Sequence, residues 1–155
     1  MEDAGPEDLM LRETSPHYRQ AVPLFAGAGK TLARLHRAGI YHADCKASNF
    51  VVREEPDGSL RLSLIDCDDV RVVSSLSPDR AIKNLAQFLG IHWHITDEEL
   101  RTKASCAFLD AYFAEAPWPT LPRVKEKILA HIRVLYPTKP IEVMERILAQ
   151  WEETR

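Results

Sequence analysis

At residues 42–52 the chain reads HADCKASNFVV, a polar, aperiodic segment that passes directly into an apolar one. The polar part, which begins near Ile40, predicts a loop, and the apolar part predicts a strand. Asp57-Gly58 is a hairpin turn signal, and the alternating residues 60–65 predict a returning strand. Because the two strands of a hairpin return the chain to the same end, we expect the polar loop to lie beside the acidic residues 66–69.

These two loops contain the groups that phosphoryl transfer requires. A carboxylate must orient the acceptor hydroxyl and take its proton, and a cation must offset the charge on the moving phosphoryl group. Asp44 and Lys46 fit these two roles. Asn49 and Asp66 offer an amide oxygen and a carboxylate, which are the hard ligands that Mg²⁺ prefers. The sequence therefore predicts Asp44 and Lys46 as catalytic residues and Asn49 and Asp66 as metal ligands.

The composition restricts the class of protein. The chain has 155 residues, the usual size of one domain. With 20 Lys and Arg against 23 Asp and Glu, its formal net charge of -3 argues against a general nucleic-acid binder, which needs a basic surface. The three cysteines are too scattered for a disulfide framework and fit a reducing compartment. The longest uncharged stretch, residues 84–96, is shorter than the ~20 residues of a spanning helix, so we expect a cytoplasmic protein.

The rest of the sequence is mainly helical by its periodicity. Apolar residues recur at helical spacing, and cap, glycine and proline signals separate the segments. The predicted helices cover residues 24–38, 79–89, the segment from the capping box Thr96–Glu99 to Pro117, and residues 124–135 and 141–151. The expected fold is therefore α+β and mostly α, with one small β-hairpin.

Residues 26–31 read Ala-Gly-Ala-Gly-Lys-Thr, which is similar to a phosphate-binding P-loop. That pattern needs a glycine five residues before its second glycine, and Leu24 stands there. It also needs a strand before the loop, and none is predicted. We therefore interpret these residues as part of the first helix.

The two acidic loops match motifs of the protein-kinase-like fold. His42, Asp44 and Asn49 have the spacing of its catalytic loop, H-x-D-x-x-x-x-N. Lys46 matches the variant with a Lys two residues after the Asp. Asp66 stands where the D-F-G motif begins, although this chain reads Asp-Cys-Asp there. Through HADCKASNFVV, LSLIDCDDVRV and DRAIKNLAQFL, the chain most resembles the bacterial lipopolysaccharide kinases, the Kdo/heptose kinase group, over roughly residues 1–90.

This resemblance implies an enzyme that moves the γ-phosphoryl group of ATP to a hydroxyl of a lipid-linked sugar, such as Kdo. ATP and Mg²⁺ would be the cofactors, and nucleic acid would not be a partner. Asp44 would be the base and Lys46 the phosphate neutraliser. Because the acceptor is linked to a lipid, the resemblance also implies peripheral work at the inner face of the cytoplasmic membrane.

The nucleotide contacts follow from the same resemblance. Residues 1–8 resemble the hinge that joins the two kinase lobes, so the backbones of Glu2 and Ala4 would contact adenine. Val51 would form part of the floor beneath the adenine ring. Ile65 would line the pocket beside the magnesium site.

A basic segment and a helix follow the metal-binding Asp in this group after a short gap. Arg71, Arg80 and Lys83 stand there and are candidates for binding an anionic sugar or the phosphates. Two further positions have supporting roles by the same resemblance. His42 would steady the catalytic loop, and Asn84 would accept hydrogen bonds from the loop backbone, at a helix position where kinases commonly have an Asp.

The motif positions also bear on how much of a kinase the chain contains. With a hinge at residue 2 and a catalytic loop at residue 42, residues 1–155 correspond to a single kinase-like C-lobe with the N-lobe absent. This C-lobe would have a hinge-like start at 1–8, catalytic and metal-binding loops at 40–69, and a helical bundle at 79–155. The glycine-rich loop and strand Lys of a kinase N-lobe have no counterpart. We expect weak nucleotide affinity and little turnover, unless a second chain supplies the missing lobe.

Three other functions fit parts of this pattern. A protein Ser/Thr kinase of the same fold is disfavoured because the gap between Asp66 and Asp79 leaves no room for a long activation loop. A small-molecule phosphotransferase of the aminoglycoside or choline type is disfavoured by Lys46, since those enzymes usually carry His or Asp there. The third alternative is a non-catalytic, pseudokinase-like binding module, which the missing lobe favours.

Overall fold

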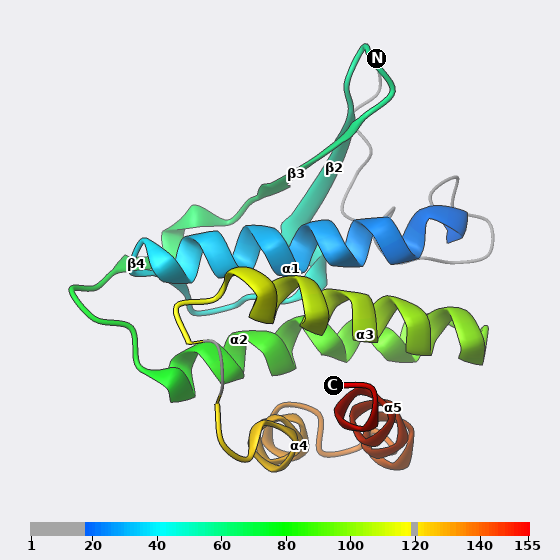
Figure 1. Ribbon diagram of the computed structural model, residues 1–155. Coiled ribbons are helices and arrows are strands. Elements are labelled where there is room, and N and C mark those ends of the chain that lie inside the picture. The colour runs from blue at the N-terminus through cyan, green and yellow to red at the C-terminus, as the bar shows by residue number, and fades with distance from the viewer. Residues whose placement is uncertain (1–17, 119–120) are drawn as a thin grey trace.

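The computed structural model describes residues 18–118 and 121–155. These residues form a mainly helical body from which a β-hairpin extends (Figure 1). The helices are α1 (Ala21–Arg37), α2 (Pro78–Leu89), α3 (Glu98–Glu115), α4 (Val124–Leu135) and α5 (Glu142–Glu153). The predicted α+β, mostly α fold is confirmed. The hinge-like start, with the predicted adenine contacts Glu2 and Ala4, lies outside the described residues.

The helical body is built around the close packing of α1 on α3, which run side by side (Figure 1). Gly29 makes this approach possible, because a Cβ at that position would lie 2.2 Å from the carbonyl oxygen of Phe108 on α3. Residues 26–31 lie inside α1, as predicted, and do not form a P-loop. On the other side, α4 packs on α2 and α5 packs on α3 and α4. None of the helices in the described ranges is long and apolar enough to cross a membrane.

The predicted hairpin consists of β2 (Phe50–Glu54) and β3 (Leu60–Leu64). The two strands are antiparallel, with Phe50 opposite Leu64 and Glu54 opposite Leu60. This register places the residues before β2 beside the residues after β3. The expected meeting of the two polar loops at one end of the hairpin is therefore confirmed.

A second two-stranded sheet was not predicted. β1 (Ile40–His42) pairs antiparallel with β4 (Val70–Val72), and His42 lies opposite Val70. The prediction of a loop from Ile40 onward is therefore wrong for residues 40–42. A three-residue strand is too short to show an alternating pattern. Its partner strand is also distant in the sequence, since even the nearest pair, His42 and Val70, is 28 residues apart. The sheet holds His42, which precedes the polar loop, opposite Val70, which follows the acidic residues 66–69.

The helix starts differ slightly from those predicted. α3 is capped by Asp97, whose Oδ1 accepts the N–H of Leu100 at 2.8 Å, so the N-cap lies one residue beyond the Thr96 of the predicted capping box. α2 begins with Pro78, and Ser77 caps it by accepting the N–H of Arg80 at 3.3 Å. Both caps use short polar side chains that bond the third helical residue.

Four aromatic rings join the root of the hairpin to the helices. Phe88 of α2 stacks on Phe108 of α3 with ring centroids 4.2 Å apart. Phe25 of α1 and Phe50 of β2 each meet Phe88 edge-on at 5.2 Å. Because Phe50 directly follows the polar loop, this buried cluster fixes the position of the loop relative to α2.

Candidate active site

The polar loop 43–49 carries both predicted catalytic residues. The Nζ of Lys46 lies 2.6 Å from Oδ2 of Asp44, and about half of the Lys46 side chain is exposed. The hydrogen bond to Asp44, together with the nearby carboxylates of Asp66 and Asp69, raises the pKa of the Lys46 ammonium. Lys46 therefore remains a cation at neutral pH, and the structure brings the predicted base and the predicted neutralising group into direct contact.

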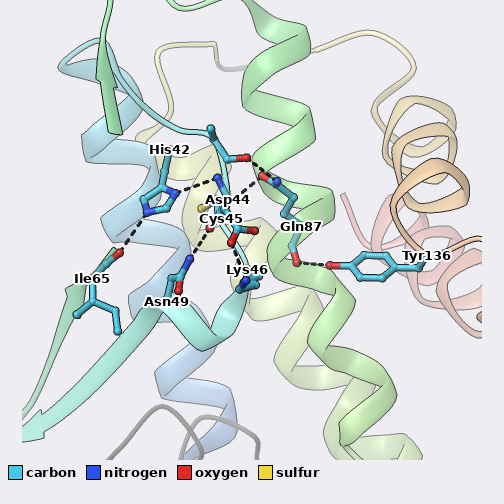
Figure 2. A network of polar contacts seen from close by, with 9 residues as sticks. His42, Asp44, Cys45, Lys46, Asn49, Ile65, Gln87 and Tyr136 are labelled. Carbon is cyan, nitrogen blue, oxygen red and sulfur yellow. Dashed lines mark hydrogen bonds and ion pairs between the residues drawn. The ribbon is translucent and has the colours of Figure 1, made fainter. Parts of the chain in front are cut away.

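His42 ties the two polar loops together, as expected of a structural residue. Its Nδ1 accepts the backbone N–H of Asp44 at 3.1 Å, so the ring proton lies on Nε2, which donates to the carbonyl oxygen of Ile65 at 3.2 Å (Figure 2). The ring is 1% exposed. Both ring nitrogens are occupied by backbone groups, so this histidine fixes the backbone of Asp44 relative to Ile65.

Asn84 and Gln87 join α2 to the backbone of the polar loop by hydrogen bonds. Asn84 Nδ2 donates to the carbonyl of His42 at 2.7 Å and to Oε1 of Gln87 at 2.9 Å. The same Oε1 accepts the N–H of Cys45 at 3.2 Å, while Gln87 Nε2 donates to the carbonyl of Ala43 at 2.8 Å (Figure 2). The expectation that Asn84 accepts hydrogen bonds from the loop is therefore wrong, because Asn84 donates and Gln87 is the acceptor.

The network continues through α1 to α3. His36 Nε2 donates to Oδ1 of Asn84 at 3.1 Å, and His36 Nδ1 accepts the hydroxyl of Tyr112 at 2.7 Å. Burial raises the pKa of the Tyr112 hydroxyl, which keeps it a donor. Burial also lowers the pKa of His36 to about 4, although the hydrogen bond with Asn84 opposes this shift. A neutral His36 thus fixes the orientation of the Asn84 amide.

Three carboxylates gather where the two loops meet. One oxygen each from Asp44, Asp66 and Asp69 lies within 4.8 Å of the other two. Asp66 adopts a left-handed backbone conformation, with φ 60° and ψ 52°, and the 3-10 turn η4 (Cys67–Asp69) follows it. This tight turn directs Asp69 back toward Asp44. Such a set of hard oxygen donors fits a divalent cation of the Mg²⁺ or Ca²⁺ type.

Asn49, the other predicted metal ligand, lies at the same end of the hairpin. Its Nδ2 donates to the carbonyl of Asp44 at 2.7 Å, and its backbone carbonyl accepts the N–H of Ile65 at 2.8 Å. The amide nitrogen is thus used for the loop, which leaves the side-chain oxygen for a ligand. Asp69 was missed in the sequence, since its approach depends on the left-handed turn at Asp66.

The predicted nucleotide and acceptor residues are dispersed. Val51 and Ile65 are half-buried at the root of the hairpin. Arg71 donates to the carbonyls of Asp68 and Val70 at 2.8 and 2.9 Å, and the Arg80 guanidinium lies 5.5 Å from the centre of the Tyr41 ring.

Lys83, the third basic residue, is half-buried on α2. Arg71 and Arg80 therefore contact the chain's own groups in this structure.

The loop and the carboxylate cluster supply the groups of a phosphotransferase: a positioned carboxylate, a cation beside it and oxygen donors for a metal. Comparison with known families identifies the particular family. The model of the lipopolysaccharide kinase (Kdo/WaaP) family matches residues 10–112, and the chain belongs to this family. A comparison with curated proteins found no match. The match begins after residues 1–8 and continues into α3, whereas the resemblance was expected over residues 1–90.

Membership of this family implies two classes of substrate. A kinase uses ATP as the phosphoryl donor, and a lipopolysaccharide kinase uses a sugar acceptor. The match includes both polar loops, α1, α2 and most of α3, which are the elements that the buried hydrogen-bond network joins.

Proposed function

We propose that this chain carries the catalytic loop of an ATP-dependent kinase that phosphorylates a hydroxyl of Kdo or of another sugar in the lipid A core. The observation that carries the proposal is the contact between Asp44 and Lys46 beside the carboxylates of Asp66 and Asp69. Family membership supports the reaction class. A lipid-linked acceptor would bring the protein to the inner face of the cytoplasmic membrane as a peripheral partner.

In this proposal Asp44 orients the acceptor hydroxyl and takes its proton. The oxygen of that hydroxyl forms a bond to the γ-phosphorus of ATP, the bond from this phosphorus to the bridging oxygen breaks, and ADP leaves with the electron pair. Lys46 turns from Asp44 to offset charge on the transferred group. His42 and Asn49 hold the Asp44 backbone in place throughout, through the N–H and the carbonyl respectively.

The metal ligands in this proposal are Asp66, Asn49 and, as an addition from the structure, Asp69. A bound Mg²⁺ would supply positive charge that offsets the nucleotide phosphates. Val51 and Ile65 would lie against the nucleotide at the hairpin root. Glu2 and Ala4 would hold adenine through their backbones.

Nucleotide binding tests the metal part of this proposal. We expect wild-type protein to bind a non-hydrolysable ATP analogue more tightly with Mg²⁺ than without it, by calorimetry. Asp66→Asn should reduce this Mg²⁺-dependent gain about tenfold or more, and it should fold normally because Asn tolerates the left-handed conformation. Asp68→Asn, an exposed neighbour outside the cluster, is the matched control. Nucleotide binding that ignores Mg²⁺ would contradict the metal assignment.

Phosphate transfer tests the role of Asp44. Because we expect slow turnover, transfer of labelled γ-phosphate from ATP to Kdo-bearing lipid A is measured with the protein in excess over ATP, and Asp44→Asn should lower its rate by about 10²-fold or more, the usual contribution of a general base. NMR signals of the Cys45 backbone amide and the Gln87 side-chain amide, which hydrogen-bond in the folded loop, show whether the variant folds. Undiminished transfer in this variant would overturn the assignment of the base.

A further inference from the structure

A pocket of about 180 Å³ opens beside the catalytic loop, and its far side is formed by residues outside any sequence motif. It lies between the loop, the end of α2, the 3-10 turn η5 (Gly90–His94) and Tyr136, the residue that follows α4. The lining residues that matter here are Lys46, Ser48, Gln87, Gly90, His94 and Tyr136. Arg71, Arg80 and Lys83 are not among the residues that line it.

The aromatic wall of this pocket is held rigidly. The Tyr136 hydroxyl donates to the backbone carbonyl of Gln87 at 3.0 Å (Figure 2), and burial raises the pKa of this hydroxyl, which keeps it a donor. The ring meets Trp93 edge-on with centroids 5.2 Å apart. Trp93 is itself fixed, since its indole N–H donates to the carbonyl of Pro140 at 3.1 Å.

Gly90 is required for this arrangement. A Cβ at Gly90 would lie 2.4 Å from both Cζ and the hydroxyl oxygen of Tyr136, closer than such atoms can approach. Any side chain at this position would therefore push the Tyr136 ring out of its place. The pocket shape thus depends on Gly90, and a substitution at this position would displace Tyr136 and distort the pocket.

The pocket reaches one of the two predicted catalytic residues. Lys46 lines it, and the ammonium of Lys46 lies 2.6 Å from the Asp44 carboxylate. Gln87, another lining residue, fixes the backbone of Ala43 and Cys45 on either side of Asp44. A molecule seated in the pocket would lie against Lys46, whose ammonium contacts the Asp44 carboxylate. An acceptor hydroxyl at the Lys46 end of the pocket would therefore lie near Asp44, as it must if Asp44 is the base.

The size and lining of the pocket indicate the kind of molecule. A cavity of about 150 Å³ holds one benzene ring, so a space of about 180 Å³ suits one six-membered ring with small substituents. The flat face of Tyr136 can pack on such a ring. The Ser48 hydroxyl, the exposed His94 imidazole and the Lys46 ammonium can bond its hydroxyl groups.

We propose that this pocket binds the single sugar ring that carries the acceptor hydroxyl, and that Ser48, His94 and Tyr136 recognise it. The inference rests on the proposed function, because the role of the ring as acceptor requires Asp44 to be the base. It replaces Arg71, Arg80 and Lys83 as the expected acceptor contacts. Tyr136 shapes the pocket wall, while Ser48 and His94 supply polar contacts next to Lys46.

The test is an NMR titration of ¹⁵N-labelled protein with free Kdo, without nucleotide. We expect saturable shifts at Ser48, Gln87, Gly90 and Tyr136. Gly90→Ala, which displaces the Tyr136 ring, and Ser48→Ala, which removes one hydroxyl, should each weaken binding, the former by about tenfold. Ser63→Ala, at an exposed position on β3, is the matched control and should bind Kdo normally.

Shifts centred on Arg71, Arg80 and Lys83, or the absence of saturable shifts anywhere, would overturn this inference. A Gly90→Ala variant that binds Kdo normally would also overturn it. A parallel titration with ADP and Mg²⁺ separates this inference from the proposed function. Nucleotide binding without sugar in the pocket rejects the pocket alone. Sugar binding in the pocket without Mg²⁺-dependent nucleotide binding rejects the kinase proposal, and with it the role of the bound sugar as acceptor.

Discussion

Asn84 donates a hydrogen bond from its side-chain nitrogen to the backbone carbonyl of His42, and this contact of 2.7 Å anchors the start of the catalytic loop on α2. The Asn84 side chain is fully buried, and its oxygen is already used by His36. Its nitrogen also serves Gln87. The amide thus meets two acceptors, the His42 carbonyl and Gln87 Oε1, and one donor, the His36 ring.

We therefore expect Asn84→Asp to destabilise the protein. A carboxylate cannot donate to His42 or Gln87, and it would be buried with only the donor of His36, which costs about 2–4 kcal/mol of unfolding free energy. Burial raises the folded-state pKa of the introduced carboxyl above its unfolded value of about 3.9. The deficit is therefore smallest below that value and grows as the pH rises through the folded pKa.

Urea denaturation at several pH values measures this deficit. Gln150→Glu, which introduces the same charge at an exposed position of α5, is the matched control and should change stability by less than about 0.5 kcal/mol. If Asn84→Asp were as stable as wild type in mild alkali, the donor role of Asn84 would be refuted.

The difference between an accepting and a donating Asn84 shows how far sequence reasoning reaches. The resemblance placed Asn84 next to the catalytic loop correctly. It could do so because the family motif includes the helix position that Asn84 occupies. The direction of its hydrogen bonds depends on two other residues. His36 comes from α1, and Gln87 lies one helical turn further along α2. Gln87 could have been found, since residues three apart lie on the same face of a helix.

The hairpin and the carboxylate cluster show the same limit. Alternation and Asp57-Gly58 predicted β2 and β3, and hairpin geometry then predicted that Asn49 and Asp66 would lie at one end. Asp69 joins the cluster only because Asp66 adopts a left-handed conformation, which no local pattern of non-glycine residues indicates. The same holds for the pocket, because Tyr136, just after α4, bonds Gln87 from 49 positions away in the sequence.

Gln87 gives a second prediction, about the loop itself. Gln87→Met keeps the length of the side chain but removes the partners of the Cys45 N–H and the Ala43 carbonyl. We expect a loss of about 1–3 kcal/mol in stability. Hydrogen exchange of the Cys45 amide should accelerate more than that of amides in α5.

The same replacement at Gln150, which is exposed, serves as the control and should leave exchange in the loop unchanged. Uniform acceleration over the whole chain would indicate general destabilisation and would contradict a local role for Gln87.

His36 predicts a pH dependence of stability. Its folded-state pKa of about 4 lies below the unfolded value of 6.5, because burial disfavours the charged ring. The unfolded chain therefore binds more protons between these values, and the stability gained from neutral His36 is complete above about pH 6.5 and is lost as the pH falls toward 4. Linkage gives a loss of about 2.5 kcal/mol between about pH 7.5 and about pH 4.5.

Urea midpoints of wild type and His36→Gln at both pH values isolate this contribution. The variant cannot titrate at this position, so its stability should fall less over the same window by about that amount. A parallel fall in the two proteins would show that His36 is not held neutral by the fold.

The packing of α1 on α3 gives the last prediction, and two glycines on one helix provide its internal control. A Cβ at Gly29 would meet the carbonyl oxygen of Phe108 at 2.2 Å, and backbone cannot move aside without separating the helices. We expect Gly29→Ala to cost about 3 kcal/mol, at the upper end of overpacking effects. A Cβ at Gly27 would meet only the Cδ1 of Leu62, at 2.6 Å, which a change of rotamer can relieve.

Because Ala also favours the helix over Gly by roughly 0.5–1 kcal/mol, Gly27→Ala should lie within about 1 kcal/mol of wild type. Thermal and urea unfolding measure both variants. Since α1 carries His36, Gly29→Ala should also weaken the contact between His36 and Tyr112 and raise the exchange rate of the Cys45 amide. Similar stabilities for the two variants would contradict the assignment of Gly29 as the residue that sets the distance between α1 and α3.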